Sequence, residues 1–114
     1  MRIFRDIILP MVLFFSASAN STYKDTFNVK VDLLSAWSIS GAVLVQTDPR
    51  PNITGLSCSN DYWLILNKVD LGYDAMFSML LVAQTMQTPI IVRAENNGNN
   101  QFCHLSRVIT LPSH

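Results

Sequence analysis

The first nineteen residues limit what this chain can fold into, because they have the pattern of a leader that is removed on export. Arg2 and Arg5 precede an apolar run over 7–15, and Ala17-Ser18-Ala19 supplies a small-x-small cleavage site. The apolar run is far shorter than the roughly 20 residues that a helix needs to cross a bilayer. We therefore predict a secretory signal peptide over 1–19, no membrane span, and a soluble exported domain over 20–114 that is periplasmic or secreted.

The charge of the exported part argues against a nucleic-acid partner. The chain has eight basic and eight acidic residues, and six basic and seven acidic ones follow the leader, which gives a net charge of −1. A surface that binds nucleic acid through phosphates needs an excess of basic residues. We therefore expect no nucleic-acid partner, and the remaining length predicts a single domain.

The chain has two cysteines, Cys58 and Cys103. Both follow the leader, and an even cysteine count in an exported protein indicates a disulfide. In the chain-entropy account, closing this loop stabilises the fold by roughly 4 kcal/mol. The cysteines and the two histidines lack the paired spacing of a closed zinc site, so we predict one disulfide, no metal and no cofactor.

Alternating apolar residues predict strands in the first half of the exported part. The apolar positions between 27 and 33 have a period of two, which is typical of a half-buried strand. The same phase continues over 37–45, which predicts either a second strand or a continuation of the first beyond a bend at Gly41. A hairpin loop between the two strands would have to lie within 33–36. The residues expected on the buried face of the first strand are Phe27, Val29, Val31 and Leu33.

The middle of the chain is predicted to be a loop followed by a buried strand. Residues 48–61 are rich in Pro, Gly, Asn, Ser and Asp, which indicates a loop that carries Cys58. The run Tyr62–Leu66 is short and continuously apolar, so we predict a strand buried on both faces, with Trp63 inside the protein.

A helix is predicted over 71–87, with Asp70 as its N-cap. This stretch lacks proline, and its apolar residues recur at steps of three and four. The residues predicted to face the core are Met76, Met79, Leu80, Ala83 and Met86. The other side carries Phe77, Leu81 and Val82, so the apolar surface is wider than one sheet face needs. The excess predicts deep burial or a homo-oligomer formed through the helix.

The C-terminal part predicts a β-hairpin, with strands over 90–94 and 102–111 and an Asn-Gly turn within 96–100. The predicted elements thus follow one another as strands, a single helix and two further strands. This is the order found in a small five-stranded β-barrel of the oligonucleotide- and oligosaccharide-binding (OB) type. We therefore predict a mainly β fold with one α-helix, arranged as a partly open OB-like barrel. The alternative is an α+β fold in which the helix packs on an antiparallel sheet.

Five segments carry a resemblance to known proteins: Cys58, Tyr62-Trp63-Leu64, Ala75 to Ala83, Ile90-Ile91-Val92 and Cys103. Together they resemble a broad group of small secreted bacterial proteins, and the B subunits of pentameric AB-type toxins, which share the barrel and the single helix. The similarity covers about 37–111, and its motifs are mostly apolar. The resemblance implies the disulfide, and its toxin-like part implies ring oligomers and carbohydrate binding.

The chain departs from the pattern of that group in two places. Gln87-Thr88-Pro89 stands where the group has Gly-Lys before the Val-rich strand, and the strand over 27–33 is an N-terminal addition. No glycan-binding motif of the toxin subunits matches residues of this chain. The resemblance therefore assigns no ligand residues.

The residue types argue against an enzyme. His104 stands alone in the expected fold, without the nucleophile motif or the paired carboxylates that a hydrolase needs. Arg93 and Glu95 share one face of their strand and Arg107 lies on the next, which predicts a cross-strand ion pair, with an anion or sugar-acid site as the alternative. The candidate ligand-binding residues are Trp37, Tyr62, Arg93, His104 and Arg107.

These observations predict a non-catalytic binding protein. The first hypothesis is a toxin-B-like or lectin-like recognition subunit with a glycan as its partner, because aromatic faces suit sugar rings. The alternative is a periplasmic structural or inhibitor protein that docks a single protein partner through its apolar surface.

Overall fold

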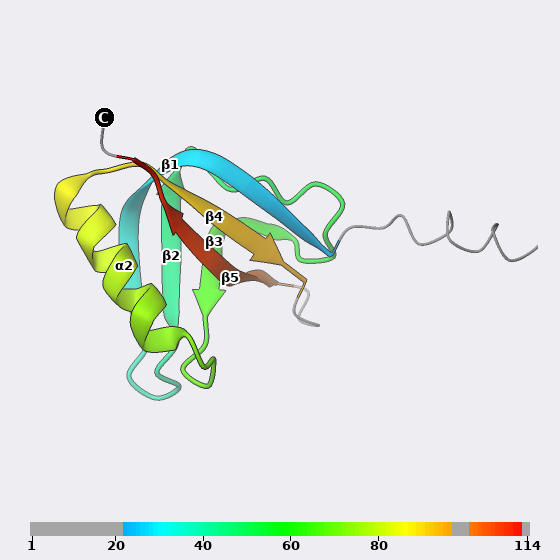
Figure 1. Cartoon of the computed structure of the whole chain (residues 1–114). Helices are drawn as coiled ribbons and strands as arrows, with labels where there is room; N and C mark the ends of the chain where they lie inside the picture. Colours follow the sequence, from blue (N-terminus) through cyan, green and yellow to red (C-terminus); the bar gives the residue numbers. More distant parts are fainter. Residues whose placement is uncertain (1–21, 97–100, 113–114) are drawn as a thin grey trace, which may run out of the picture.

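The computed structural model describes residues 22–96 and 101–112, which form one barrel with a helix packed on it (Figure 1). The predicted signal peptide and most of the turn predicted over 96–100 lie outside these residues. The elements are β1 (Tyr23–Ala36), β2 (Val43–Asp48), β3 (Asn60–Leu66), α2 (Tyr73–Met86), β4 (Ile90–Glu95) and β5 (Phe102–Thr110).

The strands close into a barrel in the order β1-β2-β3-β5-β4. Neighbours are antiparallel, except that β3 and β5 run parallel. This order, with the helix between β3 and β4, confirms the predicted mainly β, OB-like barrel with one helix. The ring is closed rather than partly open, and its seam between β3 and β5 is interrupted by a register shift.

β1 pairs with both β4 and β2, and each of the two pairings contains one bulge. The register shifts on both sides of the Val29–Val31 segment, and Asn28 has a left-handed backbone with φ 58°. A bulge bends a strand and reverses which side chains face the core. Val29 and Val31 are therefore fully buried, whereas Phe27 and Leu33 are 62% and 50% exposed. The prediction that all four apolar residues face the core is wrong at its two ends.

The second strand starts later than predicted. β1 continues through 33–36, the segment expected to hold the hairpin loop, and residues 37–42 form the turn instead. The Trp37 N–H donates to the Ala42 carbonyl at 2.8 Å, and the Gly41 N–H donates to the Trp37 carbonyl at 3.0 Å. Apolar alternation over 37–42 therefore does not produce a strand, because the backbone hydrogen bonds of this segment close a turn.

Gly41 allows the turn to pack closely on the β3–α2 loop. Its φ of +76° lies in the region that favours glycine. A Cβ at this position would also approach the Lys68 Cβ to 3.1 Å. The two loops are therefore held side by side at one end of the barrel (Figure 1).

The strand buried on both sides is β2, not β3. Every residue from Val43 to Thr47 is buried. On β3, Leu64 and Leu66 are fully buried, but Trp63 is only half-buried and Tyr62 is exposed. The prediction that β3 is buried on both faces, with Trp63 inside, is therefore wrong.

The helix packs against β1 and β5 through part of its predicted face. Leu80 and Ala83 are buried, and Met76 and Met79 pack partly buried against the core. Met86, predicted to face the core, is 66% exposed at the C-terminal end of the helix. There Gln87 adopts a left-handed C-cap conformation, and its side-chain Nε2 donates to the Val31 carbonyl at 3.2 Å.

The helix begins at a different cap from the predicted one. Gly72 occupies the N-cap position, and no side chain caps the helix. Asp70 is not the cap, because its carboxylate accepts a hydrogen bond from the Asn67 N–H at 3.1 Å within the preceding turn. No described helix has the length and apolar character needed to span a membrane.

The predicted C-terminal hairpin is confirmed by the antiparallel pairing of β4 with β5. A register shift places Arg93 opposite Arg107 but Ala94 opposite Leu105, so Ser106 is an extra residue in β5. Because of this bulge, the next buried residue after Leu105 is Val108. Ile109, which shares the alternation of Leu105 in the sequence, is only half-buried.

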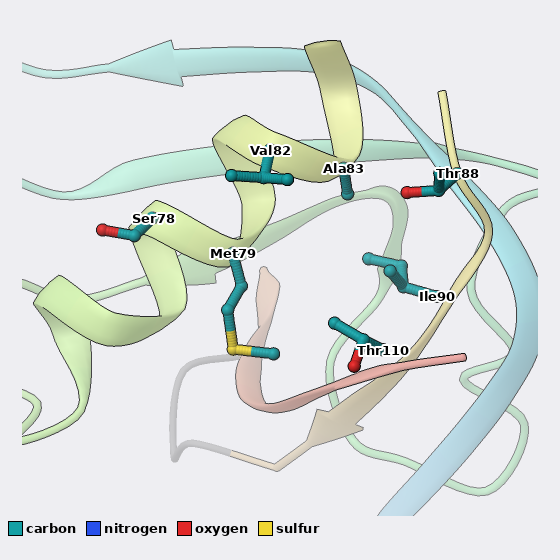
Figure 2. A pocket seen from close by; sticks show the side chains of 7 residues that line it. All are labelled: Ser78, Met79, Val82, Ala83, Thr88, Ile90 and Thr110. Carbon is teal, nitrogen blue, oxygen red and sulfur yellow. The ribbon is translucent and has the colours of Figure 1, made fainter. Parts of the chain in front are cut away.

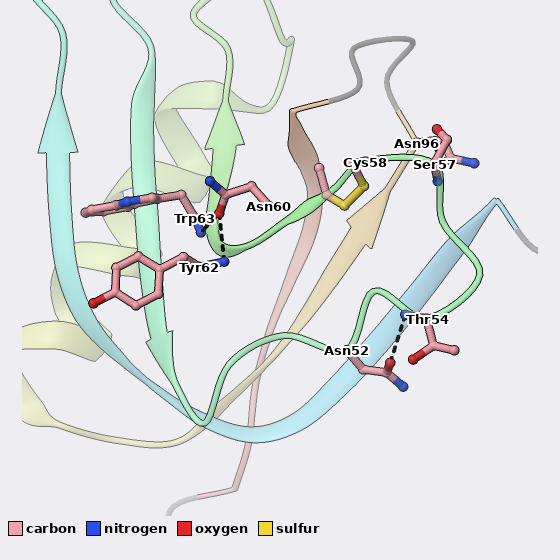
Figure 3. Close-up of a disulfide and its surroundings, with 9 residues drawn as sticks. Asn52, Thr54, Ser57, Cys58, Asn60, Tyr62, Trp63 and Asn96 are labelled. Atoms are coloured by element: carbon pink, nitrogen blue, oxygen red, sulfur yellow. Dashed lines mark hydrogen bonds between the residues drawn. A yellow bond between two sulfur atoms is a disulfide. The ribbon is translucent and has the colours of Figure 1, made fainter.

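The predicted Cys58–Cys103 disulfide is present (Figure 3). It joins the long loop after β2 to the start of β5. The Asn96 side chain holds the same loop, accepting hydrogen bonds from the Ser57 N–H at 2.7 Å and the Ser57 hydroxyl at 3.1 Å. The Asn52 N–H also donates to the Thr26 hydroxyl on β1 at 2.7 Å. The loop that precedes β3 is thus fixed at several points.

Candidate functional site

The structure distributes the five predicted ligand-binding residues over four places. Arg93 and Arg107 lie opposite each other on β4 and β5. His104 lies on β5, Tyr62 on β3, and Trp37 in the β1–β2 turn. Trp37 has no ring contact with Tyr62 among the described residues. The five residues therefore do not form one site.

Arg93 makes a cross-strand ion pair, but its partner is Asp25 on β1, which the prediction did not name. Its Nε and Nη2 donate to the two carboxylate oxygens of Asp25 at 2.9 and 3.2 Å. The guanidinium also lies 4.0 Å from the centre of the Tyr23 ring. Because the two-pronged donor face of Arg93 is occupied by Asp25, this cluster has little capacity left for an external anion.

The hydrogen bonds from Arg93 lower the pKa of Asp25, and the positive charges of Arg93 and Arg107 act in the same direction. A lowered pKa in the folded state means that ionised Asp25 stabilises the fold above its unfolded pKa of about 3.9. This stabilisation is lost as the pH falls through the lower, folded-state pKa.

In the Asp25→Asn variant, the free energy of unfolding is therefore expected to fall less than in the wild type as the pH is lowered into the acid range. Urea unfolding of wild type and variant at neutral pH and below about pH 4 measures the effect. The matched control is Asp61→Asn, because Asp61 pairs with Arg50 at 3.7 Å and is 54% exposed, so its loss should matter little. Equal acid sensitivity of the Asp25→Asn variant and the wild type would contradict the assignment.

His104 has a structural partner. Its Nε2 lies 2.7 Å from Asp70 Oδ2, and each of the two side chains is about a quarter exposed. The contact ties β5 to the β3–α2 loop. It also accounts for Asp70 facing away from the helix N-terminus.

Tyr62, Trp63 and Arg50 form a cluster on the outer surface, which we call the aromatic corner. Asn60 fixes the backbone that carries the two aromatic residues. Its Oδ1 accepts hydrogen bonds from the Tyr62 N–H at 2.8 Å and the Trp63 N–H at 3.0 Å (Figure 3). Asn side chains commonly bond to the backbone two residues on in this way. The turn coincides with the register shift between Asn60 and Leu64. As a result, both consecutive aromatic side chains point away from the core.

The two rings of the corner meet edge to face. Their centres are 5.9 Å apart and their planes cross at 85°, an arrangement that aromatic pairs favour. The guanidinium carbon of Arg50 lies 4.6 Å from the centre of the Tyr62 ring, and Arg50 also faces the Asp61 carboxylate. The corner thus combines ring faces, guanidinium donors and a carboxylate acceptor on an exposed surface.

The corner lies on the side of the barrel formed by β2 and β3. Leu64 and Leu66 point inward, so Trp63 lies on the outward phase of β3, the strand that pairs with β2. The outward-phase residues of β2, Leu44 and Gln46, are buried. OB barrels use this β2–β3 face to bind oligonucleotides and oligosaccharides.

Sequence reasoning found Tyr62 but missed its partners. Asn60 carried a usable signal, because an Asn two residues before paired aromatic residues is placed to form such a turn. Arg50 carried none, because its contact with Tyr62 depends on how the loop after β2 folds back.

Comparisons with protein-family models, with curated proteins and with solved structures find no match for this chain. Any assignment of function therefore depends on the geometry of the site, with the fold as an analogy.

Proposed function

We propose that this protein is a non-catalytic recognition module that binds carbohydrate at the aromatic corner. The observation that carries the proposal is the outward-facing pair of exposed Tyr62 and half-buried Trp63 beside Arg50. A sugar ring stacks its C–H face on an aromatic ring and directs its hydroxyl groups to polar side chains at the edge. The corner offers both kinds of contact within one small area.

The fold and the charge together favour sugar over nucleic acid. The β2–β3 face of OB barrels binds either oligosaccharides or oligonucleotides. Six basic against seven acidic residues after the expected leader give no attraction for a phosphate backbone. Of the two ligand classes that suit this face, the carbohydrate is therefore the one we propose, in keeping with a lectin-like or toxin-B-like recognition subunit.

Glycan-array screening of the exported protein, followed by calorimetry on the strongest glycan, tests the proposal. We expect Tyr62→Ala and Trp63→Ala each to weaken binding about tenfold or more, since a tenfold change corresponds to about 1.4 kcal/mol, within the range of a central aromatic contact. The matched control is Tyr23→Ala, because Tyr23 has the same exposure and also lies beneath an arginine, but on β1. An array without binding, or equal losses for Tyr62→Ala and Tyr23→Ala, would refute the proposal.

A second candidate function is docking of a protein through α2. Leu81, Val82 and Met86 are exposed and, with Thr85, line a shallow groove of about 270 Å³. A second groove of about 240 Å³ lies between α2 and the ends of β4 and β5 (Figure 2). It is lined mainly by Met79, Val82, Ala83, Thr88, Ile90 and Thr110. These adjoining apolar surfaces fit a second copy of the chain better than a polar ligand.

Light scattering of the exported protein at micromolar concentration tests this candidate. Val82 lines both grooves, so Val82→Asp is expected to reduce a discrete oligomer to the monomer. Ala75→Asp is the control, because Ala75 is an exposed residue of the same helix that lines neither groove. A wild type that is monomeric throughout would contradict a homo-oligomer.

A further inference from the structure

The β1–β2 turn and the β3–α2 loop each present two large apolar side chains to solvent. Ile39, Val69 and Leu71 are each at least 88% exposed, and Trp37 is 52% exposed. We call these four residues the apolar tips. Apolar side chains that are scattered singly over a surface need no explanation, but a cluster of them marks an interaction surface.

The two loops form one unit. The Tyr73 hydroxyl donates to the Gly41 carbonyl at 2.9 Å, and Gly41 packs directly against the Lys68 side chain. Figure 1 shows both loops side by side at one end of the barrel, away from the C-terminal end of β5. The apolar tips are thus presented together by a connected pair of loops.

The charged side chains of the two loops, one basic and one acidic, each have a partner within the protein. Lys68 places its Nζ 4.8 Å from the centre of the Tyr73 ring. Asp70 directs its carboxylate to the Asn67 N–H and to His104. The turn over 38–41 contains no charged residue. What protrudes into solvent at this end is therefore apolar and carries almost no net charge.

From this geometry we propose that the apolar tips insert into the interfacial layer of a phospholipid bilayer. Side chains that are almost fully exposed project from the surface without a wall around them. A protein partner would need a matching pocket for each one, whereas a bilayer accepts convex groups of any shape. Tryptophan beside aliphatic residues also suits the boundary between headgroups and acyl chains.

The apolar tips are expected to bind lipid without regard to its charge. Interfacial binding scales with the apolar area that is buried, with a further term for attraction to anionic lipid. The two charges of the loops are opposite in sign and each has a partner in the protein, so the apolar term dominates here. Binding is expected on uncharged phosphatidylcholine vesicles and is expected to persist in about 0.5 M salt, which screens charge–charge attraction.

The two tryptophans of the chain allow a direct test. The exported protein, with its N-terminus established by mass spectrometry, is mixed with phosphatidylcholine vesicles that carry brominated acyl chains. In Trp63→Phe the remaining Trp37 should shift its emission to the blue and be quenched by bromine. In Trp37→Phe the remaining Trp63 should show neither change, because it lies on the barrel wall.

A vesicle co-sedimentation series completes the test. Ile39→Ser combined with Leu71→Ser is expected to lower the vesicle partition coefficient about tenfold or more, since the two changes remove several CH2 and CH3 groups that would be buried in the bilayer. The matched control is Phe27→Ser combined with Leu33→Ser on β1, which should leave the partition unchanged, because both residues are exposed and lie outside the apolar tips and the α2 grooves. All four residues are exposed, so circular dichroism should show the same fold in every variant.

Three results would overturn the proposal: no association of the wild type with the vesicles, association that requires anionic lipid, or equal partition of the Ile39→Ser/Leu71→Ser variant and the wild type. The vesicles contain no sugar, so none of these outcomes bears on carbohydrate binding at the aromatic corner.

Discussion

Replacing both Cys58 and Cys103 by alanine is expected to lower the free energy of unfolding by about 2–5 kcal/mol. The disulfide joins residues 45 positions apart, so its loss gives the unfolded chain much more freedom. In the folded state the bridge anchors the loop after β2 to the first residues of β5. A loss of this size is comparable to the whole stability of many small domains.

Urea unfolding with and without a thiol reductant measures this effect. The wild type should lose stability when reductant is added, whereas the Cys58→Ala/Cys103→Ala variant should not change. Both cysteines are buried, so the variant also loses some packing, and the reductant series on the wild type separates that contribution. Wild-type stability that does not respond to complete reduction, verified by counting thiols, would show that the bridge contributes little.

Leu80→Ala is expected to cost about 2–5 kcal/mol of stability. Leu80 is fully buried and is the main side chain that α2 inserts into the barrel core. Its truncation leaves a cavity where the helix meets the wall, and the closely packed surroundings can fill it only in part. The effect should appear in chemical unfolding and in the thermal midpoint.

The next residue of the helix supplies the control. Leu81 undergoes the same chemical change in Leu81→Ala, but it is 42% exposed, so the loss should stay below about 1 kcal/mol. Equal losses for the two variants would mean that α2 does not pack on the barrel in the orientation described.

The fold could be predicted from the sequence because the order of its elements is specific. Apolar alternation, a proline-free stretch with helical periodicity and a β-branched hairpin near the C-terminus give strands, one helix and strands in the order of an OB-like barrel. The disulfide followed from an even cysteine count in a chain with an expected leader. Both predictions are confirmed by the structure.

The phase of individual strands could not be predicted, because bulges interrupt it. Phe27 and Leu33 continue the alternation of Val29 and Val31 in the sequence, yet they are exposed because the register shifts on both sides of that segment. Trp37 likewise continues the alternation but lies in a turn that Gly41 permits. A period of two assumes a regular strand, and the closure of a small barrel requires bends.

The candidate site was predictable only in part. Tyr62 is recognisable as an aromatic residue near a strand end. The side toward which it and Trp63 point depends on the hydrogen bonds of Asn60, and the polar partner Arg50 comes from a loop held by the disulfide. Contacts that depend on the path of a long loop leave no periodic signal in the sequence.

We propose carbohydrate recognition at the aromatic corner as the function of this protein. The most direct test is an NMR titration that follows the indole N–H signals of Trp63 and Trp37 separately. The probes are neutral hexose, N-acetylhexosamine and sialic-acid oligosaccharides. We expect the Trp63 signal to shift in a saturable way with one of these classes while the Trp37 signal stays in place. Signals that both stay fixed through the whole panel, or a shift confined to Trp37, would contradict the claim.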